Sequence, residues 1–243
     1  MNENLTELVV VMDKSGSMEP LQNDAIGGFN TFLKSQKEAP GEAKMTVVLF
    51  DTTYSFYAAN VDVKNVKPLD ASTYKPDGGT ALYDALCTTI DEIGKKLAAM
   101  KEEDRPARVI FAILTDGEEN SSRQFNRKEA FDRIARQRDQ YKWDFLFLAA
   151  GEGAFQAGES IGMTKSKIAM FKNDSKGQSA SYNAMSNYAA ASRSVSLKAY
   201  EDLSANFDTQ MEVNAMLAGM SSTIDLKKTE TAPPLDKGDQ KTP

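Results

Sequence analysis

Three oxygen-bearing side chains lie at a spacing of two residues near the amino terminus: Asp13, Ser15 and Ser17. A carboxylate and two hydroxyls are hard ligands, and Gly16 between the serines eases a tight bend. Hard oxygens in a tight loop suit Mg2+, Mn2+ or Ca2+ and do not suit zinc or copper. The segment therefore predicts a site for a divalent cation.

A predicted strand positions this loop. Val9-Val10-Val11-Met12 is an unbroken apolar run, which is typical of a strand buried on both faces, and we expect that strand at 5–12. The loop that follows lies at the carboxyl end of the strand, and ligands bind at that edge in open α/β sheets. The three oxygens are therefore expected where such sheets place their binding sites.

Two further polar segments occur downstream, each at the predicted end of an element. Gly78-Gly79-Thr80 precedes a helix predicted at 81–100, and Thr115-Asp116 ends an apolar strand predicted at 108–115. Together with the loop at 13–17, and in the same order, these segments resemble the metal-ion-dependent adhesion site (MIDAS) of the von Willebrand factor A (VWA) domain. The resemblance covers roughly residues 5–205 and favours an intracellular protein of bacterial or phage type.

The resemblance implies five metal ligands and a mode of binding. Ser15, Ser17 and Thr80 would bind the ion through their hydroxyls. Asp13 and Asp116 would hold it directly or through water. Mg2+ is the expected ion, with Mn2+ or Ca2+ as alternatives. One coordination position would remain for an Asp or Glu carboxylate of a partner protein, so the ion would be the centre of the interface.

Each of these residues also has a purely structural interpretation. Asp13 can cap a turn while Ser15 and Ser17 bond the loop backbone. Thr80 can be only the N-cap of the following helix, and Asp116 with the next glycine is a common turn dipeptide. Because all of these interpretations would have to hold together at three element ends, we prefer the metal site.

The polar residues beside the motifs have two interpretations. Glu118, Glu119 and Asn120 either line the rim of the site or are solvated loop residues and helix caps. Asp84 either reaches toward the metal loops or is an acid favoured in the first turn by the helix dipole.

Apolar periodicity predicts six strands with helices between them. Strands are expected at 5–12, 45–50, 54–61, 108–115, 143–149 and 167–171, and helices at 20–36, 81–100, 127–140, 155–161 and 179–203. This alternation indicates an α/β fold with a doubly wound, mostly parallel six-stranded sheet and helices on both faces. The resemblance implies that this fold is of the VWA, Rossmann-like type. The strand at 54–61 is expected at an edge, antiparallel to its neighbour. Gly27 and Gly28 in the first helix predict close packing against the sheet.

We divide the chain into three parts. The VWA domain is expected at 1–205. An extension at 206–226 holds a short helix that either packs on the domain or docks a partner. The tail at 227–243 carries lysines, acids and prolines without an aromatic residue, so we expect it to be disordered.

Composition excludes several classes of function. The 243 residues include no histidine, which removes the usual general base and the Ser-His-Asp triad. A net charge of -6 argues against nonspecific binding of nucleic acid, and no stretch is long enough to span a membrane. Cys87 is the single cysteine and no secretory signal is visible. We therefore expect a cytoplasmic monomer that binds neither nucleic acid nor membrane.

The leading hypothesis is a divalent-metal-dependent protein-interaction module without catalysis. One alternative is a Mg2+-dependent phosphoryl-transfer enzyme of the haloacid-dehalogenase type, which needs a second acid where Ser15 stands. A nucleotide-binding protein of Rossmann type would need a glycine fingerprint after the first strand, and Lys14-Ser15-Gly16 stands there instead. The remaining alternative is a metal-independent scaffold, which the complete set of five ligands disfavours.

Overall fold

The computed structural model describes residues 1–116 and 118–226. They form a six-stranded sheet in the order β3-β2-β1-β4-β5-β6. The strands are β1 (Asn2–Asp13), β2 (Glu42–Phe50), β3 (Tyr54–Asp62), β4 (Pro106–Thr115), β5 (Asp144–Ala150) and β6 (Ile168–Phe171). Neighbouring strands are parallel except for β3, which runs antiparallel to β2 at one edge. The predicted α/β fold, with its doubly wound, mostly parallel sheet and antiparallel edge strand, is confirmed.

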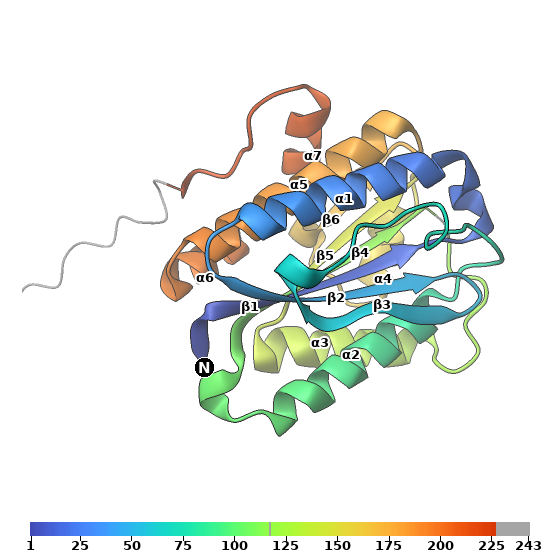
Figure 1. The fold of residues 1–243 in the computed structure, drawn as a ribbon. Coiled ribbons are helices and arrows are strands. Elements are labelled where there is room, and N and C mark those ends of the chain that lie inside the picture. Colours follow the sequence, from blue (N-terminus) through green and yellow to red (C-terminus); the bar gives the residue numbers. More distant parts are fainter. Residues whose placement is uncertain (117, 227–243) are drawn as a thin grey trace, which may run out of the picture.

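Helices cover both faces of this sheet. They are α1 (Gln22–Glu38), α2 (Leu82–Ala99), α3 (Arg127–Tyr141), α4 (Ala154–Ser160), α5 (Ser175–Ser194), α6 (Leu197–Asn206) and α7 (Thr209–Leu217). In Figure 1, α1 and α5 lie on one side of the sheet, and α2 and α3 lie on the other. The 3-10 turn at Gly16–Leu21 precedes α1, so the helix predicted from residue 20 begins two residues later.

Strand β1 contributes to both cores because its side chains alternate between the faces. Leu8 and Val10 lie in the core beneath α1 and α5, with Phe29 of α1. Val9 and Val11 lie in the other core, beneath α2 and α3. The strand is therefore buried on both faces, as its unbroken apolar sequence predicts.

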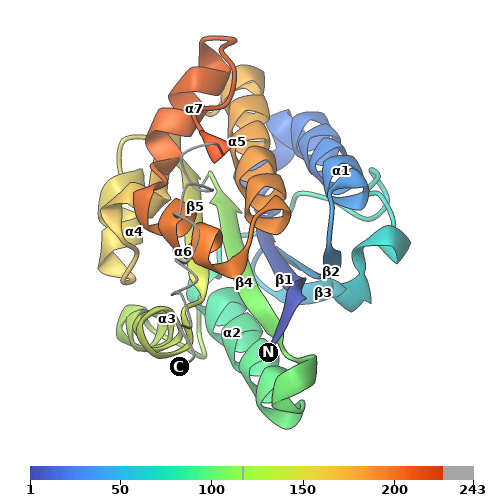
Figure 2. The same ribbon diagram turned by 90° about the vertical axis from the view of Figure 1, so that its left-hand side faces the viewer.

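The direction in which successive strands are added to the sheet reverses after β3, so that β1 and β4 are neighbours whose following loops diverge. From β1 the chain passes to β2 and β3 on one side, and it then returns to form β4 on the other side of β1 (Figure 2). The loops after β1 and β4 therefore leave the same sheet edge toward opposite faces. This arrangement is the switch point at which open α/β sheets bind ligands.

The prediction of a single helix at 179–203 is wrong. The structure has α5 and α6 instead, separated by the extended residues Val195 and Ser196. The Ser196 hydroxyl accepts from the backbone N–H of Ala199 at 3.3 Å and so starts α6. Arg108 donates to the carbonyl oxygen of Val195 at 2.8 Å and holds the break. The apolar spacing continues across this break, so periodicity alone did not reveal it.

The last described helix, α7, packs on α5 and β6, and its Val213 is part of the core. Its Gln210 also protects the free edge of β6. The Gln210 amide accepts from the Met170 backbone N–H at 2.7 Å and donates to the Met170 carbonyl at 3.1 Å. The segment 227–243, expected to be disordered, lies outside the described residues. No helix of the described part is both long and apolar enough to cross a membrane.

The two glycines of α1 have different surroundings. A Cβ added to Gly28 would lie 2.2 Å from the ring of Tyr182 on α5, whereas one added to Gly27 would meet nothing within 4 Å. The prediction that both glycines pack closely against the sheet is therefore wrong. Of the two, only Gly28 is closely packed, and it packs against helix α5 and not against the sheet. Tyr182 is fully surrounded by core residues and cannot move aside.

We expect opposite effects from alanine at these adjacent positions. Gly28→Ala should lower the free energy of unfolding by about 1–3 kcal/mol because the methyl group overlaps Tyr182. Gly27→Ala should raise it by roughly 0.5–1 kcal/mol because alanine is the better helix former. Urea unfolding of the two variants and the parent protein measures both changes in the free energy of unfolding. A destabilised Gly27→Ala protein, or an unchanged Gly28→Ala protein, would contradict the packing of α1 on α5.

Candidate metal centre

Asp13 is the last residue of β1 and is only 1% exposed. Its Oδ1 accepts from the backbone N–H of Ser15 at 2.7 Å, and its Oδ2 accepts from the Thr115 hydroxyl at 2.6 Å. The first bond shapes its own loop and the second reaches the end of β4. The carboxylate is therefore fixed at the junction of the two strands.

The side chains that follow these strands form a continuous chain of hydrogen bonds. The Ser17 hydroxyl donates to Asp116 Oδ1 at 2.8 Å, and the hydroxyl oxygens of Ser15 and Ser17 are 3.1 Å apart. Asn173, just after β6, donates to Asp116 Oδ2 at 3.0 Å. Two of the three predicted motifs are thus in direct side-chain contact.

Backbone bonds bring the third motif to the same place. The N–H of Gly16 donates to the carbonyl of Gly78 at 3.0 Å, so the loop before α2 adjoins the loop after β1. The N–H of Thr80 donates to Asn120 Oδ1 at 2.9 Å, which joins it to the loop after β4. Thr80 is 2% exposed, and its hydroxyl makes no hydrogen bond to any described residue. All three motifs therefore meet at the carboxyl edge of β1 and β4.

Thr80 is not the N-cap of α2, although its position just before the helix predicted that role. The N-cap is Ala81, which has no capping side chain. The first free N–H groups of the helix are instead bonded by the loop after β4. Glu119 accepts from Tyr83 at 3.0 Å, and Ser122 accepts from Asp84 at 3.1 Å. Glu119 is thus a helix cap, one of its two predicted roles, and the Thr80 hydroxyl needs another explanation.

Asp84 does not reach toward the metal loops. Its carboxylate accepts from the backbone N–H groups of Arg123, Gln124 and Phe125 at 2.8–3.0 Å. These bonds hold the segment that leads from β4 into α3. Asp84 therefore positions a loop, and neither of its two predicted roles describes this.

The junction concentrates negative charge. Burial raises the pKa of Asp13 to about 6, against the hydrogen bonds from Thr115 and Ser15, and the nearby Asp116 also raises it. No ion pair reaches Asp13 or Asp116 from the described residues, and Lys14 is paired with Asp51 instead. Two adjacent carboxylates without a basic partner favour a cation between them.

The donor set suits a hard divalent ion. It combines two carboxylates with three hydroxyls, all oxygen ligands of the kind that Mg2+, Mn2+ and Ca2+ prefer. Residues 1–116 and 118–226 contain no cluster of three or more His, Cys, Asp or Glu side chains suited to a metal. A site made largely of hydroxyls would not form such a cluster. The residues present therefore fit the ion that the motif implies.

The supporting residues differ in how far the sequence could have revealed them. Asn173 lies 57 positions from Asp116, and nothing in its surroundings predicts the contact. Asn120 was predicted either to line the rim of the site or to be a loop residue or cap, and its bond to the Thr80 N–H places it beside the site. Thr115 could have been found, since a strand beside β1 must end near Asp13 and its terminal hydroxyl is then in reach.

We expect Asp84→Ala to lower the free energy of unfolding by about 2–4 kcal/mol, because three backbone N–H groups lose a charged acceptor. Asp91→Ala on the same helix is the matched control. Asp91 pairs with Arg133 at 3.0 Å near the surface, so its loss should cost about 1 kcal/mol or less. Urea unfolding compares the two variants. Equal losses would argue against the loop-holding role of Asp84.

No model of a protein family matches the chain, and no curated protein is similar to it. Solved structures are similar. Proximal thread matrix protein 1 from the mussel byssus is 15% identical, with a TM-score of 0.55 over 76% of this chain and 48% of that chain. A von Willebrand factor type A protein from Catenulispora acidiphila is 15% identical, with a TM-score of 0.52 over 78% of this chain and 43% of that chain.

A third structure concerns the motif itself. It is the mussel protein described with a zinc-occupied MIDAS motif, 16% identical with a TM-score of 0.51 over 76% of this chain and 46% of that chain. This chain thus matches less than half the length of each of these solved chains. At such identities the likeness concerns architecture alone. The chain has the fold of the von Willebrand factor A domain.

Proposed function

We propose that this chain is a divalent-metal-dependent protein-interaction module. Asp13, Ser15, Ser17, Thr80 and Asp116 hold the ion. The ion then accepts a carboxylate from an Asp or Glu of a partner protein, which completes its oxygen coordination. The chain itself carries out no reaction.

One observation carries this proposal: two carboxylates, one of them buried, belong to a hydrogen-bonded cluster with the hydroxyls of Ser15 and Ser17, and no ion pair in the described part of the chain reaches either acid. Such a pair is costly unless a cation neutralises it. The three hydroxyls supply oxygens without adding charge. An ion held by two negative charges keeps enough positive charge to attract one more carboxylate.

The proposed ligands narrow the choice of ion, and experiment must identify it. Oxygen ligands favour Mg2+, with Mn2+ or Ca2+ as alternatives. The mussel protein described with zinc at its MIDAS motif supports a divalent ion at this kind of site, and it adds zinc to the ions that must be compared.

We further propose an intracellular setting and a monomer. Cys87 is buried and unpaired, and burial raises the pKa of its thiol to about 12, so it behaves as an inert core residue. A chain without a disulfide suits a reducing compartment. The partner would be a protein, and the net charge of -6 disfavours nucleic acid.

The phosphoryl-transfer alternative meets two obstacles at the site. Its nucleophile would be Asp13, yet both carboxylate oxygens of Asp13 already accept hydrogen bonds. The acid that should assist it is replaced by Ser15, whose backbone shapes the loop. A metal-independent scaffold would leave the paired carboxylates unexplained.

Metal should stabilise the protein through these ligands. In thermal and urea unfolding, once the ion is in excess, each tenfold rise in its concentration should add about 1.4 kcal/mol to the free energy of unfolding. Ser17→Ala and Thr80→Val should each reduce the stabilisation at a given ion concentration strongly, because each removes one hydroxyl ligand and so raises the dissociation constant of the ion. Mg2+, Mn2+, Ca2+ and Zn2+ are compared against chelator.

Thr88→Val is the control, because Thr88 lies on α2 and lines a surface hollow beside β3 rather than the three loops. Its response to the ion should equal that of the parent. If the parent unfolds identically with chelator and with every ion up to millimolar concentration, the metal-independent scaffold becomes the better description.

The absence of catalysis is tested with p-nitrophenyl phosphate and Mg2+. We expect release of p-nitrophenol at the rate of the buffer alone, and the same rate for Asp13→Asn. Turnover that Asp13→Asn abolishes would replace the interaction module by the phosphoryl-transfer enzyme.

A further inference from the structure

The metal loop after β1 is supported by a side chain that belongs to none of the three motifs. This side chain is Tyr74, in the connection between β3 and α2 (residues 63–81), which also contains the third motif. Tyr74 is completely buried, and its hydroxyl donates to the carbonyl oxygen of Asp13. A core residue therefore bonds the backbone of a proposed metal ligand.

This contact lies where β1 leaves the sheet. The strand pairs with β4 as far as Met12 and with β2 as far as Asp13. Past these pairs, the course of the backbone depends on bonds outside the strand pairing. The two backbone dihedral angles of a residue orient its carbonyl and its side chain together. A bond that holds the Asp13 carbonyl therefore also restricts where the Asp13 carboxylate and the two serines after it can lie.

Two backbone bonds extend the contact along the loop. The N–H of Asp77 donates to the carbonyl of Lys14 at 2.9 Å, and the N–H of Gly16 donates to the carbonyl of Gly78 at 3.0 Å. Together with the hydroxyl contact, these bonds join the two segments at three successive points. The β3–α2 connection thus lies alongside the loop after β1, and it fixes the first motif relative to the third.

Helix α1 holds the connection in place. The Gln22 amide donates to the carbonyl of Tyr74 at 2.8 Å. The side chain of Asn30 accepts from the backbone N–H of Leu69 at 2.8 Å and donates to the Leu69 carbonyl at 2.9 Å. Figure 1 shows the connection, in teal, passing α1 on its way to the end of β1. The Tyr74 ring belongs to the core beneath α1 and α5, so its hydroxyl is a rigid support.

From the buried hydroxyl, its place at the end of β1 and its support by α1, we propose that Tyr74 is a positioning residue of the metal centre. It holds the Asp13 backbone and so keeps the ligands of the first motif at the right separation from Thr80. This inference rests on the proposed function, because the positioning serves an ion held by these loops. Groups that orient metal ligands typically change metal affinity by roughly ten- to hundredfold when they are removed.

Tyr74→Phe removes the hydroxyl and keeps the ring. Isothermal titration calorimetry with Mg2+ and with Mn2+ should give a dissociation constant roughly tenfold above that of the parent protein, because the loop loses the donor that holds its first ligand. Gln22→Ala removes a support of Tyr74 one step further from the site, and Gln22 is only half-buried, so the core stays intact. This variant should raise the dissociation constant roughly threefold.

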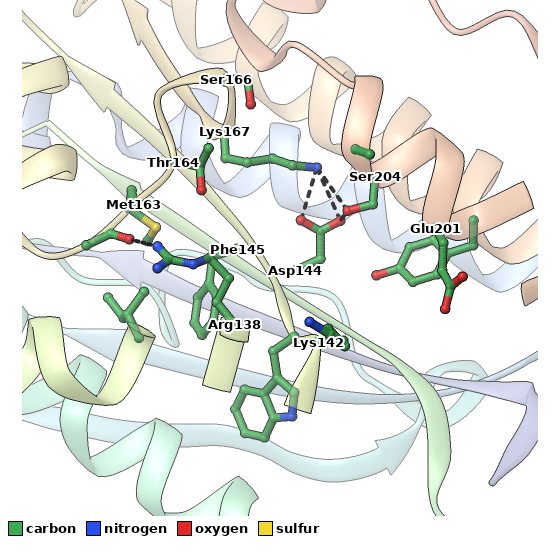
Figure 3. Close-up of a pocket in the computed structure, with 15 residues that line it drawn as sticks. Arg138, Lys142, Asp144, Phe145, Met163, Thr164, Ser166, Lys167, Glu201 and Ser204 are labelled. Atoms are coloured by element: carbon green, nitrogen blue, oxygen red, sulfur yellow. Dashed lines mark hydrogen bonds and ion pairs between the residues drawn. The ribbon is translucent and has the colours of Figure 1, made fainter. Parts of the chain in front are cut away.

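Tyr188→Phe is the matched control, because it makes the same chemical change at the opposite end of the sheet. Tyr188 is also completely buried, and its hydroxyl donates to Asp144, the first residue of β5. Asp144 keeps its bonds to Lys167 and Ser204, which converge on it in Figure 3. The control should lower the urea midpoint of unfolding as Tyr74→Phe does, and it should leave the dissociation constant of the ion within about twofold of the parent value.

Hydrogen exchange followed by NMR, with chelator present, tests the contact without any ion. The amide protons of Gly16 and Asp77 should exchange roughly tenfold faster in Tyr74→Phe than in the parent protein, because the two segments separate more often. They should exchange at the parent rate in Tyr188→Phe. A parent protein that binds no ion would refute the metal-dependent module, whereas the exchange rates test Tyr74 independently of that result.

An unchanged dissociation constant in Tyr74→Phe would overturn the positioning role, as would unchanged exchange of Gly16 and Asp77. An equal loss of affinity in Tyr188→Phe would also overturn it, because the effect would then follow from general destabilisation. Gln22→Ala is measured in the same ways, so that the outcome does not depend on Tyr74→Phe remaining folded.

Discussion

The burial of the Asp13 carboxylate at the junction of β1 and β4, beside Asp116, is the constraint on which the rest of the site depends. A hydrogen bond from Thr115 fixes the first acid at the end of β1, and one from Ser17 fixes the second just beyond β4. Neither acid has a basic partner in the described part of the chain. The hydrogen bonds of the surrounding loops hold both acids in place without a basic group.

Those contacts come from three loops that secure one another. The loop after β1 bonds the loop before α2, which bonds the loop after β4, and the last of these caps α2 through Glu119. Asp84 secures the far end of the same segment. The three loops that carry the five proposed ligands therefore come together through bonds within the protein. A preformed site loses little conformational freedom on binding, so most of the attraction remains available for the ion.

The sequence predicts the fold well, because unbroken apolar runs and helical periodicity reflect burial directly. It also predicts which residues meet at the sheet edge, since parallel strands end on one side. It does not reveal contacts made by single side chains from distant segments, such as Asn173 on Asp116. The sequence also does not reveal the break between α5 and α6, because the residue that stabilises this break, Arg108, lies on the distant strand β4. The ligand roles of the five residues still rest on the metal experiments.

The side chain of Gln210 has a consequence for how the protein behaves at high concentration. By bonding both the N–H and the carbonyl of Met170, it takes the place that a strand of another molecule would occupy along β6. The opposite edge, β3, is irregular in its pairing with β2, which makes it a poor template as well. A parallel sheet this apolar would otherwise invite intermolecular pairing. Through Gln210, the segment at 209–217 thus occupies the hydrogen-bonding groups of Met170 at this sheet edge, and another molecule cannot pair with them while α7 is in place.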